Sequence, residues 1–180
     1  AEQLADLVKS TLGPYGMDKE LVDAAGDVVL TNDGATIMKE TMFKHPTAKI
    51  ITDIARTQDE TCFDGTTSCI VINGSFMGKA KALFKMGIHP TRLAKGYNLA
   101  NNKAQELLQD IALDVDDDVL LKVAYTAMTG KSVESDQEVL AQICVDVTKS
   151  TTLDHISVVR RPNAKISDSL AISGLLVDRE

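Results

Sequence analysis

Three long helical patterns follow one another between residues 46 and 111, and they restrict the fold more than any other feature of the chain. Pro46 opens the first, which runs to about Thr61 with isoleucine and alanine on one face. The second, 65–86, carries a broad apolar stripe and ends at Gly87, and Pro90 opens the third. Because proline at the first turn and glycine after the last are typical helix boundaries, these stretches predict a mainly α-helical protein.

Shorter elements are predicted before these helices. Residues 1–12 have a helical pattern that "GPYG" at 13–16 stops, since its glycines accept positive φ and its proline fixes a turn. "KELVD" and "DVVLTND" lie on either side of a short Ala-Ala-Gly segment and predict a β-hairpin.

The composition changes at the acidic run "DVDDD", residues 114–118, which is the strongest candidate for a domain boundary. Two shorter helices are predicted after it, at about 118–128 and 136–149. "HISVVRR" and "LAISGLLVD" then predict strands. We therefore expect an α-rich block of about 115 residues followed by a smaller α/β block.

The charge, hydropathy and cysteine content argue against several classes of protein. The net charge of −7 and the pI near 5.0 argue against a nucleic-acid partner. No apolar run approaches the ~18 residues of a membrane span, and no signal peptide is visible. Three cysteines do not form a disulfide framework, so we expect a cytoplasmic protein. The chain opens inside a helical pattern and closes on a strand-like run, so we expect both ends to be cut from a longer protein, although a naturally cleaved product would look the same.

The stretch "CFDGTTSC", residues 62–69, places an acid, a glycine and three hydroxyls at the start of the second long helix. The first N–H groups of a helix lack intrahelical partners and lie at the positive end of its dipole. Gly65 leaves room for a phosphate, the hydroxyls add donors, and Asp64 can hold a Mg²⁺ ion that binds the phosphate. Taken alone, the pentapeptide "DGTTS" is more typical of an ordinary N-cap followed by a Ser/Thr-rich first turn.

Other patterns that suggest ligands fail on their spacing. "TGKS" at 129–132 resembles the end of a phosphate-binding P-loop, but Tyr125 stands where that motif needs glycine. "DVDDD" lacks the glycine and glutamate of a calcium loop. The cysteines and histidines show no paired zinc spacing, and His45 and His89 each precede a proline, which indicates helix caps.

The ordered series "TLGP", "GMDK", "TNDGATI", "HPTAK" and "DGTTS" is far more specific than any single piece. By itself "TNDGAT" is most typical of a tight turn. The whole series, with "GIHPTRLAKGY", "TAMTGKSVES" and "SGLLVDRE" after it, strongly resembles the group II chaperonins, which are the archaeal thermosome and the eukaryotic cytosolic ring chaperonin. The resemblance extends over essentially all 180 residues.

The resemblance implies a domain assignment and a function. Residues 1–116 correspond to the N-terminal part of an equatorial ATP-binding domain and 117–180 to the first part of the intermediate hinge domain, with the apical domain absent. Such subunits form a double ring with other chaperonin subunits. They hydrolyse ATP to ADP and phosphate to close the ring around unfolded protein, which the apical domain binds.

The same resemblance implies roles for individual residues. Asp64 corresponds to the Mg²⁺ ligand, Asp33 to the acid near the attacking water, and Lys131 to the lysine that senses the γ-phosphate. The remaining positions correspond to the phosphate-binding helix start (Gly65, Thr66, Thr67, Ser68), the other nucleotide contacts (Leu12, Gly13, Pro14, Gly34) and the carbonyls for a monovalent cation such as K⁺ (Thr11, Asn32).

Two positions depart from the family pattern. Phe63 stands where the family has glycine before the metal-binding aspartate, and Tyr15 stands where it has lysine. The resemblance also places a second hydrolytic aspartate outside these 180 residues, so we expect the chain alone to be catalytically incomplete. The alternative class is therefore a fragment or diverged paralogue with a structural or interaction role only.

Overall fold

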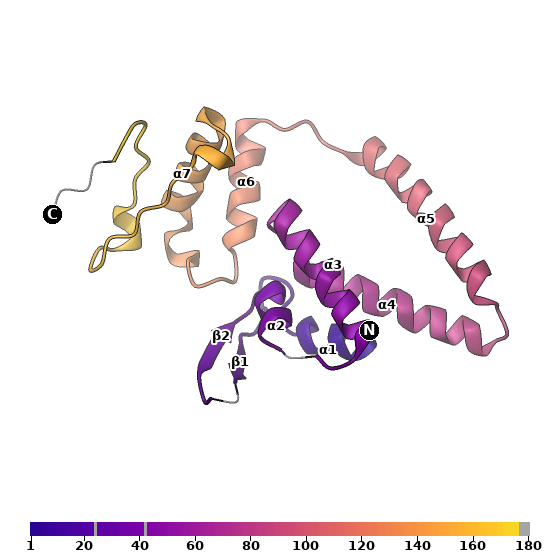
Figure 1. Ribbon diagram of the computed structural model, residues 1–180. Helices are drawn as coiled ribbons and strands as arrows, with labels where there is room; N and C mark the ends of the chain where they lie inside the picture. The colour runs from indigo at the N-terminus through magenta and orange to yellow at the C-terminus, as the bar shows by residue number, and fades with distance from the viewer. Residues whose placement is uncertain (24, 42, 177–180) are drawn as a thin grey trace. The chain divides into compact units, whose positions relative to one another are not determined.

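The computed structural model describes residues 1–23, 25–41 and 43–176 (Figure 1). The chain divides into two compact units, Ala1–Ala112 and Leu113–Glu180. The first unit holds helices and one hairpin, in the order α1 (Glu2–Lys9), β1 (Lys19–Val22), β2 (Val28–Thr31), α2 (Gly34–Glu40), α3 (Pro46–Cys62), α4 (Thr66–Lys85) and α5 (Pro90–Ile111). The mainly α-helical fold class is confirmed.

Histidine and proline together begin two of the three long helices. The Nδ1 atom of His45 accepts from the backbone N–H of Thr47 at 3.1 Å, and Pro46 takes the first helical position of α3. His89 repeats this at the start of α5, where it accepts from Thr91 at 3.3 Å. A side-chain acceptor satisfies one of the N–H groups that a helix start leaves free, and proline there has no N–H to satisfy. The prediction that both histidines cap helices is confirmed.

The core of the first unit is built around α4, on which α1, α2 and α3 pack (Figure 1). Gly74 of α4 allows α1 to approach α4 closely, because a Cβ atom at position 74 would stand 2.3 Å from the Cβ of Ala5 in α1. Burial of aliphatic side chains stabilises this arrangement by roughly 1.5–3 kcal/mol each. The buried cluster consists of Leu4, Val8, Ile37, Met38, Ala48, Ile51, Ala55 and Ile70.

The predicted hairpin is confirmed, with β1 antiparallel to β2 and Lys19 paired with Thr31. The segment after it differs from the expectation of a simple tight turn at "TNDGAT". Asp33 instead caps α2, accepting from the backbone N–H of Thr36 at 2.8 Å. The short polar side chain that favours turns also favours helix starts, and burial of Ile37 and Met38 decides for the helix.

The second unit contains α6 (Asp117–Met128) and α7 (Gln137–Ser150), the two helices that the sequence predicts, and between them the 3₁₀ turn η1 (Glu134–Asp136), which it does not predict. Asp116 caps α6 by accepting from Val119, and α6 packs on α7. Lys149 Nζ of α7 lies 2.6 Å from the carboxylate of Asp117. Two further 3₁₀ turns follow, η2 (Leu153–His155) and η3 (Ile166–Asp168).

The prediction of strands in "HISVVRR" and "LAISGLLVD" is wrong for the residues that the structure describes. Residues 156–161 and 170–176 form neither helix nor strand, and η3 lies between them. The last two residues of the second segment, 177 and 178, lie outside the described part. Both segments are β-branched, but an isolated two-stranded pair is marginal in water, and most of their side chains are exposed. Strand propensity alone was therefore insufficient.

Candidate functional site

The turn between α3 and α4 consists of Phe63, Asp64 and Gly65. Phe63 ends α3 in the left-handed conformation, with φ 57° and ψ 11° and with 69% of the residue exposed. Its N–H donates to the carbonyl of Asp59 at 2.9 Å. Gly65 is also left-handed, with φ 77°. Two left-handed residues around one aspartate reverse the chain sharply, so that α4 begins beside the end of α3.

The start of α4 differs from those of α2, α3, α5 and α6, which side chains cap. Gly65 is the N-cap of α4 and has no side chain to offer. The first helical bond runs from the N–H of Cys69 to the carbonyl of Gly65 at 2.9 Å. The N–H groups of Thr66, Thr67 and Ser68 precede that bond, so they lie in the turn that lacks intrahelical partners and that attracts anions.

Asp64 is exposed and anchored through its backbone. Its carbonyl accepts a hydrogen bond from Nε2 of Gln58 at 3.0 Å, and its Oδ1 accepts from the N–H of Gly65 at 2.7 Å. A carboxylate held beside a helix start is suited to a hard cation that also binds phosphate oxygens. Gln58 was missed at the sequence level, because nothing in "TQDET" shows that its amide reaches six residues ahead.

The start of α2 lies directly against the start of α4. Gly34 is buried, and a Cβ atom there would stand 2.6 Å from Oγ1 of Thr67 and 3.0 Å from its backbone nitrogen. Asp33 precedes Gly34, and its Oδ2 accepts from both the N–H and the hydroxyl of Thr36, each at 2.8 Å. The structure therefore brings the predicted residues Asp33 and Gly34 to the start of α4, where Thr66, Thr67 and Ser68 lie.

The loop after α1 is directed to the same end of α4, because the two helices are antiparallel. Glu2 lies beside Gly78, and one turn further along α1, Ala5 lies beside Gly74. Continuing in this direction leads to the N-terminus of α4. The loop that holds the predicted residues Leu12, Gly13 and Pro14 follows α1, and all three are exposed.

This loop is held by its own backbone. Gly13 has φ 89° and accepts from the N–H of Gly16 at 2.9 Å. Thr11 is buried, and its hydroxyl donates to the carbonyl of Val8 at 2.8 Å. The carbonyl of Thr11 lies against Gly16, where a Cβ atom would stand 2.2 Å away. Asn32, the other residue predicted to offer a carbonyl to a cation, is half-buried just before Asp33.

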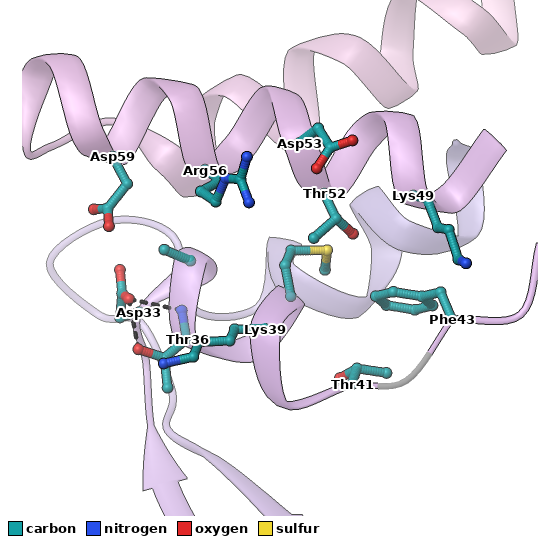
Figure 2. A pocket seen from close by; sticks show the side chains of 12 residues that line it. Asp33, Thr36, Lys39, Thr41, Phe43, Lys49, Thr52, Asp53, Arg56 and Asp59 are labelled. Atoms are coloured by element: carbon teal, nitrogen blue, oxygen red, sulfur yellow. Dashed lines mark hydrogen bonds between the residues drawn. The ribbon is translucent and has the colours of Figure 1, made fainter. Parts of the chain in front are cut away.

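A cavity of about 550 Å³ lies between α2 and α3, and Asp33 stands at its edge (Figure 2). Figure 2 shows Asp59 of α3 across from Asp33, with Arg56 one turn earlier on the same helix. Arg56 Nε lies 3.5 Å from Oε1 of Glu60. The sequence did not predict this cavity. It is lined by Asp33, Ala35, Thr36, Met38, Lys39, Thr41, Phe43, Lys49, Thr52, Asp53, Arg56 and Asp59.

Lys131, the remaining predicted residue, belongs to the second unit. It lies exposed between α6 and η1, just after Gly130, which has φ 75°. The N–H of Gly130 donates to the carboxylate of Glu134 at 3.0 Å, and the N–H of Glu134 donates to the carbonyl of Lys131 at 3.0 Å. Lys131 therefore stands on a short, internally bonded turn.

The rest of the described chain offers few other ligand sets. Among residues 1–23, 25–41 and 43–176, no three His, Cys, Asp or Glu side chains gather into a group able to hold a metal ion. No helix in these ranges has the length and apolar character needed to cross a membrane. Burial raises the pKa of the Cys69 thiol, whereas Cys62, before the turn, is exposed.

Comparison with known proteins assigns the chain to a family. The sequence model of the TCP-1/cpn60 chaperonin family matches residues 4–180. The chain belongs to the TCP-1/cpn60 chaperonin family. Among its relatives, the thermosome subunit beta of Methanothermobacter thermautotrophicus is 47% identical over 184 residues, which cover 98% of this chain and 34% of the relative. The thermosome subunit of Pyrococcus horikoshii is 43% identical over 193 residues, with 100% and 35% covered.

The family membership confirms the resemblance to group II chaperonins. The chain spans about a third of the length of the curated relatives that it matches. Its similarity to archaeal thermosome subunits extends over both compact units, since the match covers nearly all of the chain.

Proposed function

We propose that this chain supplies the Mg·ATP-binding part of an ATP-hydrolysing chaperonin subunit. The observation that carries the proposal is the contact of Gly34 with Thr67, because it joins two helix starts, each preceded by an aspartate. Asp33 stands before α2, and Asp64 stands one residue before the N-cap of α4. Phosphoryl transfer needs little more from a protein than positioning and charge stabilisation. The uncapped helix start and a cation held by Asp64 would stabilise charge, and Asp33 would position the water.

The residues present fit a magnesium nucleotide. The first turn of α4 leaves N–H groups for phosphate oxygens, and the absence of a side chain at Gly65 keeps the approach open. Asp64 would be the protein's ligand to Mg²⁺, which usually keeps several waters and binds through one or two carboxylates plus substrate phosphates. The bound metal would neutralise charge on the phosphates.

Asp33 is proposed to orient the attacking water and accept its proton. Its Oδ2 accepts from the N–H and the hydroxyl of Thr36, which fixes the orientation of the carboxylate, and an oriented carboxylate within reach of a water can act as its base. The loop of Leu12, Gly13 and Pro14 would cover the nucleotide. The carbonyls of Thr11 and Asn32 would hold a monovalent cation such as K⁺.

The wider assignment is also a proposal. Residues 1–116 would be part of the equatorial domain and 117–180 part of the hinge domain, from which Lys131 would reach the γ-phosphate when the hinge closes. The relatives are named thermosome subunits, which supports an oligomeric ring of such subunits. A double ring in the cytoplasm that acts on unfolded proteins is the form that we propose.

Nucleotide binding by the protein in its natural full length tests the proposal. We expect ATP to bind in the presence of Mg²⁺ and Asp64→Asn to weaken that binding at least tenfold, since it removes the charged ligand. Lys85→Gln, at the opposite end of α4, is the matched control and should leave binding unchanged. Equal affinity of wild type and Asp64→Asn for Mg·ATP would contradict the proposal.

A further inference from the structure

The turn between α3 and α4 is anchored by one side chain from outside it, that of Gln58. This residue lies in the last two turns of α3 and is half-buried, while its neighbours Arg56 and Thr57 are exposed. Its Nε2 donates to the carbonyl of Asp64 at 3.0 Å. The same atom would stand 3.4 Å from a Cβ atom at Gly65, so the amide rests against the glycine as well.

The peptide unit between Asp64 and Gly65 is thereby held on both sides. In a trans peptide the carbonyl and the N–H point in opposite directions. The carbonyl of this unit accepts from Gln58, and its N–H donates to Oδ1 of Asp64 at 2.7 Å. The orientation of the peptide therefore fixes the orientation of the carboxylate.

Without the hydrogen bond from Gln58, the Asp64–Gly65 peptide could rotate into another orientation at low cost. Gly65 has φ 77°, and glycine adopts positive and negative φ about equally well. A rotation of the Asp64–Gly65 peptide therefore meets little resistance at the glycine. Such a rotation would turn the N–H of Gly65 away from Oδ1 of Asp64 and release the carboxylate from its present position.

We propose that Gln58 is a positioning residue that holds the Asp64 carboxylate in place for Mg²⁺. The inference rests on the proposed function, because it assigns Gln58 a role in the metal site proposed there. Groups that hold a metal ligand in place typically contribute 10–100-fold to metal affinity or activity. A glutamine suits this role, since glutamate at position 58 would lack the donor and add a negative charge beside Asp64.

Titration of Mg²⁺ into the full-length protein with ATP present tests this inference. Gln58→Met keeps the length and helix propensity of the side chain but removes the donor. We expect it to weaken the apparent Mg²⁺ affinity about 10–100-fold while ATP binding in EDTA changes less than about twofold. Gln58→Glu should lose more than Gln58→Met, and it serves as the second variant. A purely structural role would shift both readouts together.

Thr57→Ala is the matched control on the same helix, because the hydroxyl of Thr57 donates within α3, to the carbonyl of Asp53 at 2.9 Å. It should bind Mg²⁺ as the wild type does. Wild-type affinity in Gln58→Met, alongside Mg²⁺-dependent binding by the wild type, would overturn the positioning role alone. Absence of Mg²⁺-dependent ATP binding in the wild type would overturn the proposed function, and the positioning role with it.

Discussion

Gly34 contacts Thr67 with no room for a side chain between them, since a Cβ atom at position 34 would stand 2.6 Å from Oγ1 of Thr67 and 3.0 Å from its Cα. We expect Gly34→Ala to lower the free energy of unfolding by about 1–3 kcal/mol, the usual cost of overpacking. The backbone of α4 cannot yield as a flexible side chain would. Urea unfolding of the variant measures the change.

Gly96 provides the matched control for this substitution. It lies on the exposed part of α5, and a Cβ atom there would meet nothing within 4 Å. Gly96→Ala should therefore raise the free energy of unfolding by about 0.5–1 kcal/mol through helix propensity. Stabilisation of similar size in both variants would show that α2 and α4 are not in close contact.

Phe63 occupies a left-handed position that favours glycine, at a cost of roughly 1–2 kcal/mol for an L-residue. Because 69% of the residue is exposed, little packing is lost with the ring. Phe63→Gly should therefore raise the free energy of unfolding by about 1 kcal/mol, as measured in urea. Asn163→Gly, at φ 65°, is the control and should gain less, since asparagine tolerates this region. Destabilisation by Phe63→Gly would mean that the ring has a packing role.

The fold was predictable from the sequence where the residues at a helix boundary themselves favour a helix start. Proline after a capping histidine marks the starts of α3 and α5. The start of α2 was missed because Asn-Asp-Gly by itself is most typical of a turn, whereas burial of Ile37 and Met38 favours the helix that Asp33 caps. The segments after His155 have strand-forming residues but no paired strand among the described residues.

The candidate site was predictable in its residue types and only partly in its arrangement. The run from Asp64 to Ser68 gives both the turn and the helix start, as expected. The contact of Gly34 with Thr67 and the bond from Gln58 to Asp64 depend on tertiary packing and on a side chain that reaches back to the turn. No local spacing rule encodes either of them.

The packing of α1 on α4 depends on the combined size of two small residues. A Cβ atom at Gly74 would stand 2.3 Å from the Cβ of Ala5, so Gly74→Ala should cost about 1–3 kcal/mol. Ala5→Gly in the same protein should recover part of this loss, and a double-mutant cycle by urea unfolding measures the coupling. Gly78→Ala is the control, because it would meet the flexible carboxylate of Glu2 at 2.7 Å. Additive effects of the two substitutions would contradict the contact.

Asp33 has a structural role and a proposed catalytic one, which a single substitution separates. Asn caps helices about as well as Asp, so Asp33→Asn should change the free energy of unfolding by less than about 0.5 kcal/mol. It should lower ATP turnover by about 10²–10⁴-fold, because an amide cannot accept the proton. Phosphate release and urea unfolding are measured on the same preparation. Turnover at the wild-type rate would leave Asp33 with its capping role alone.

The cysteines on either side of the turn should differ in reactivity. Burial raises the pKa of the Cys69 thiol, so less of it is thiolate at a given pH than for an unperturbed thiol. Since the thiolate is the nucleophile, iodoacetamide should label Cys69 more slowly than the exposed Cys62. Mass spectrometry of peptides at a series of times gives both rates. Faster labelling of Cys69 would place it at the surface.

The pairing of α1 with α4 also has a consequence for the order of events during synthesis. Ala5 is synthesised well before its contact Gly74. At the usual rate of 5–20 residues per second, a ribosome takes roughly 3–14 s to translate the segment between them. During that interval Leu4 and Val8, both buried in the finished molecule, have no α4 to cover them. This helix emerges early and is buried late, so its apolar face is open to factors that bind nascent chains.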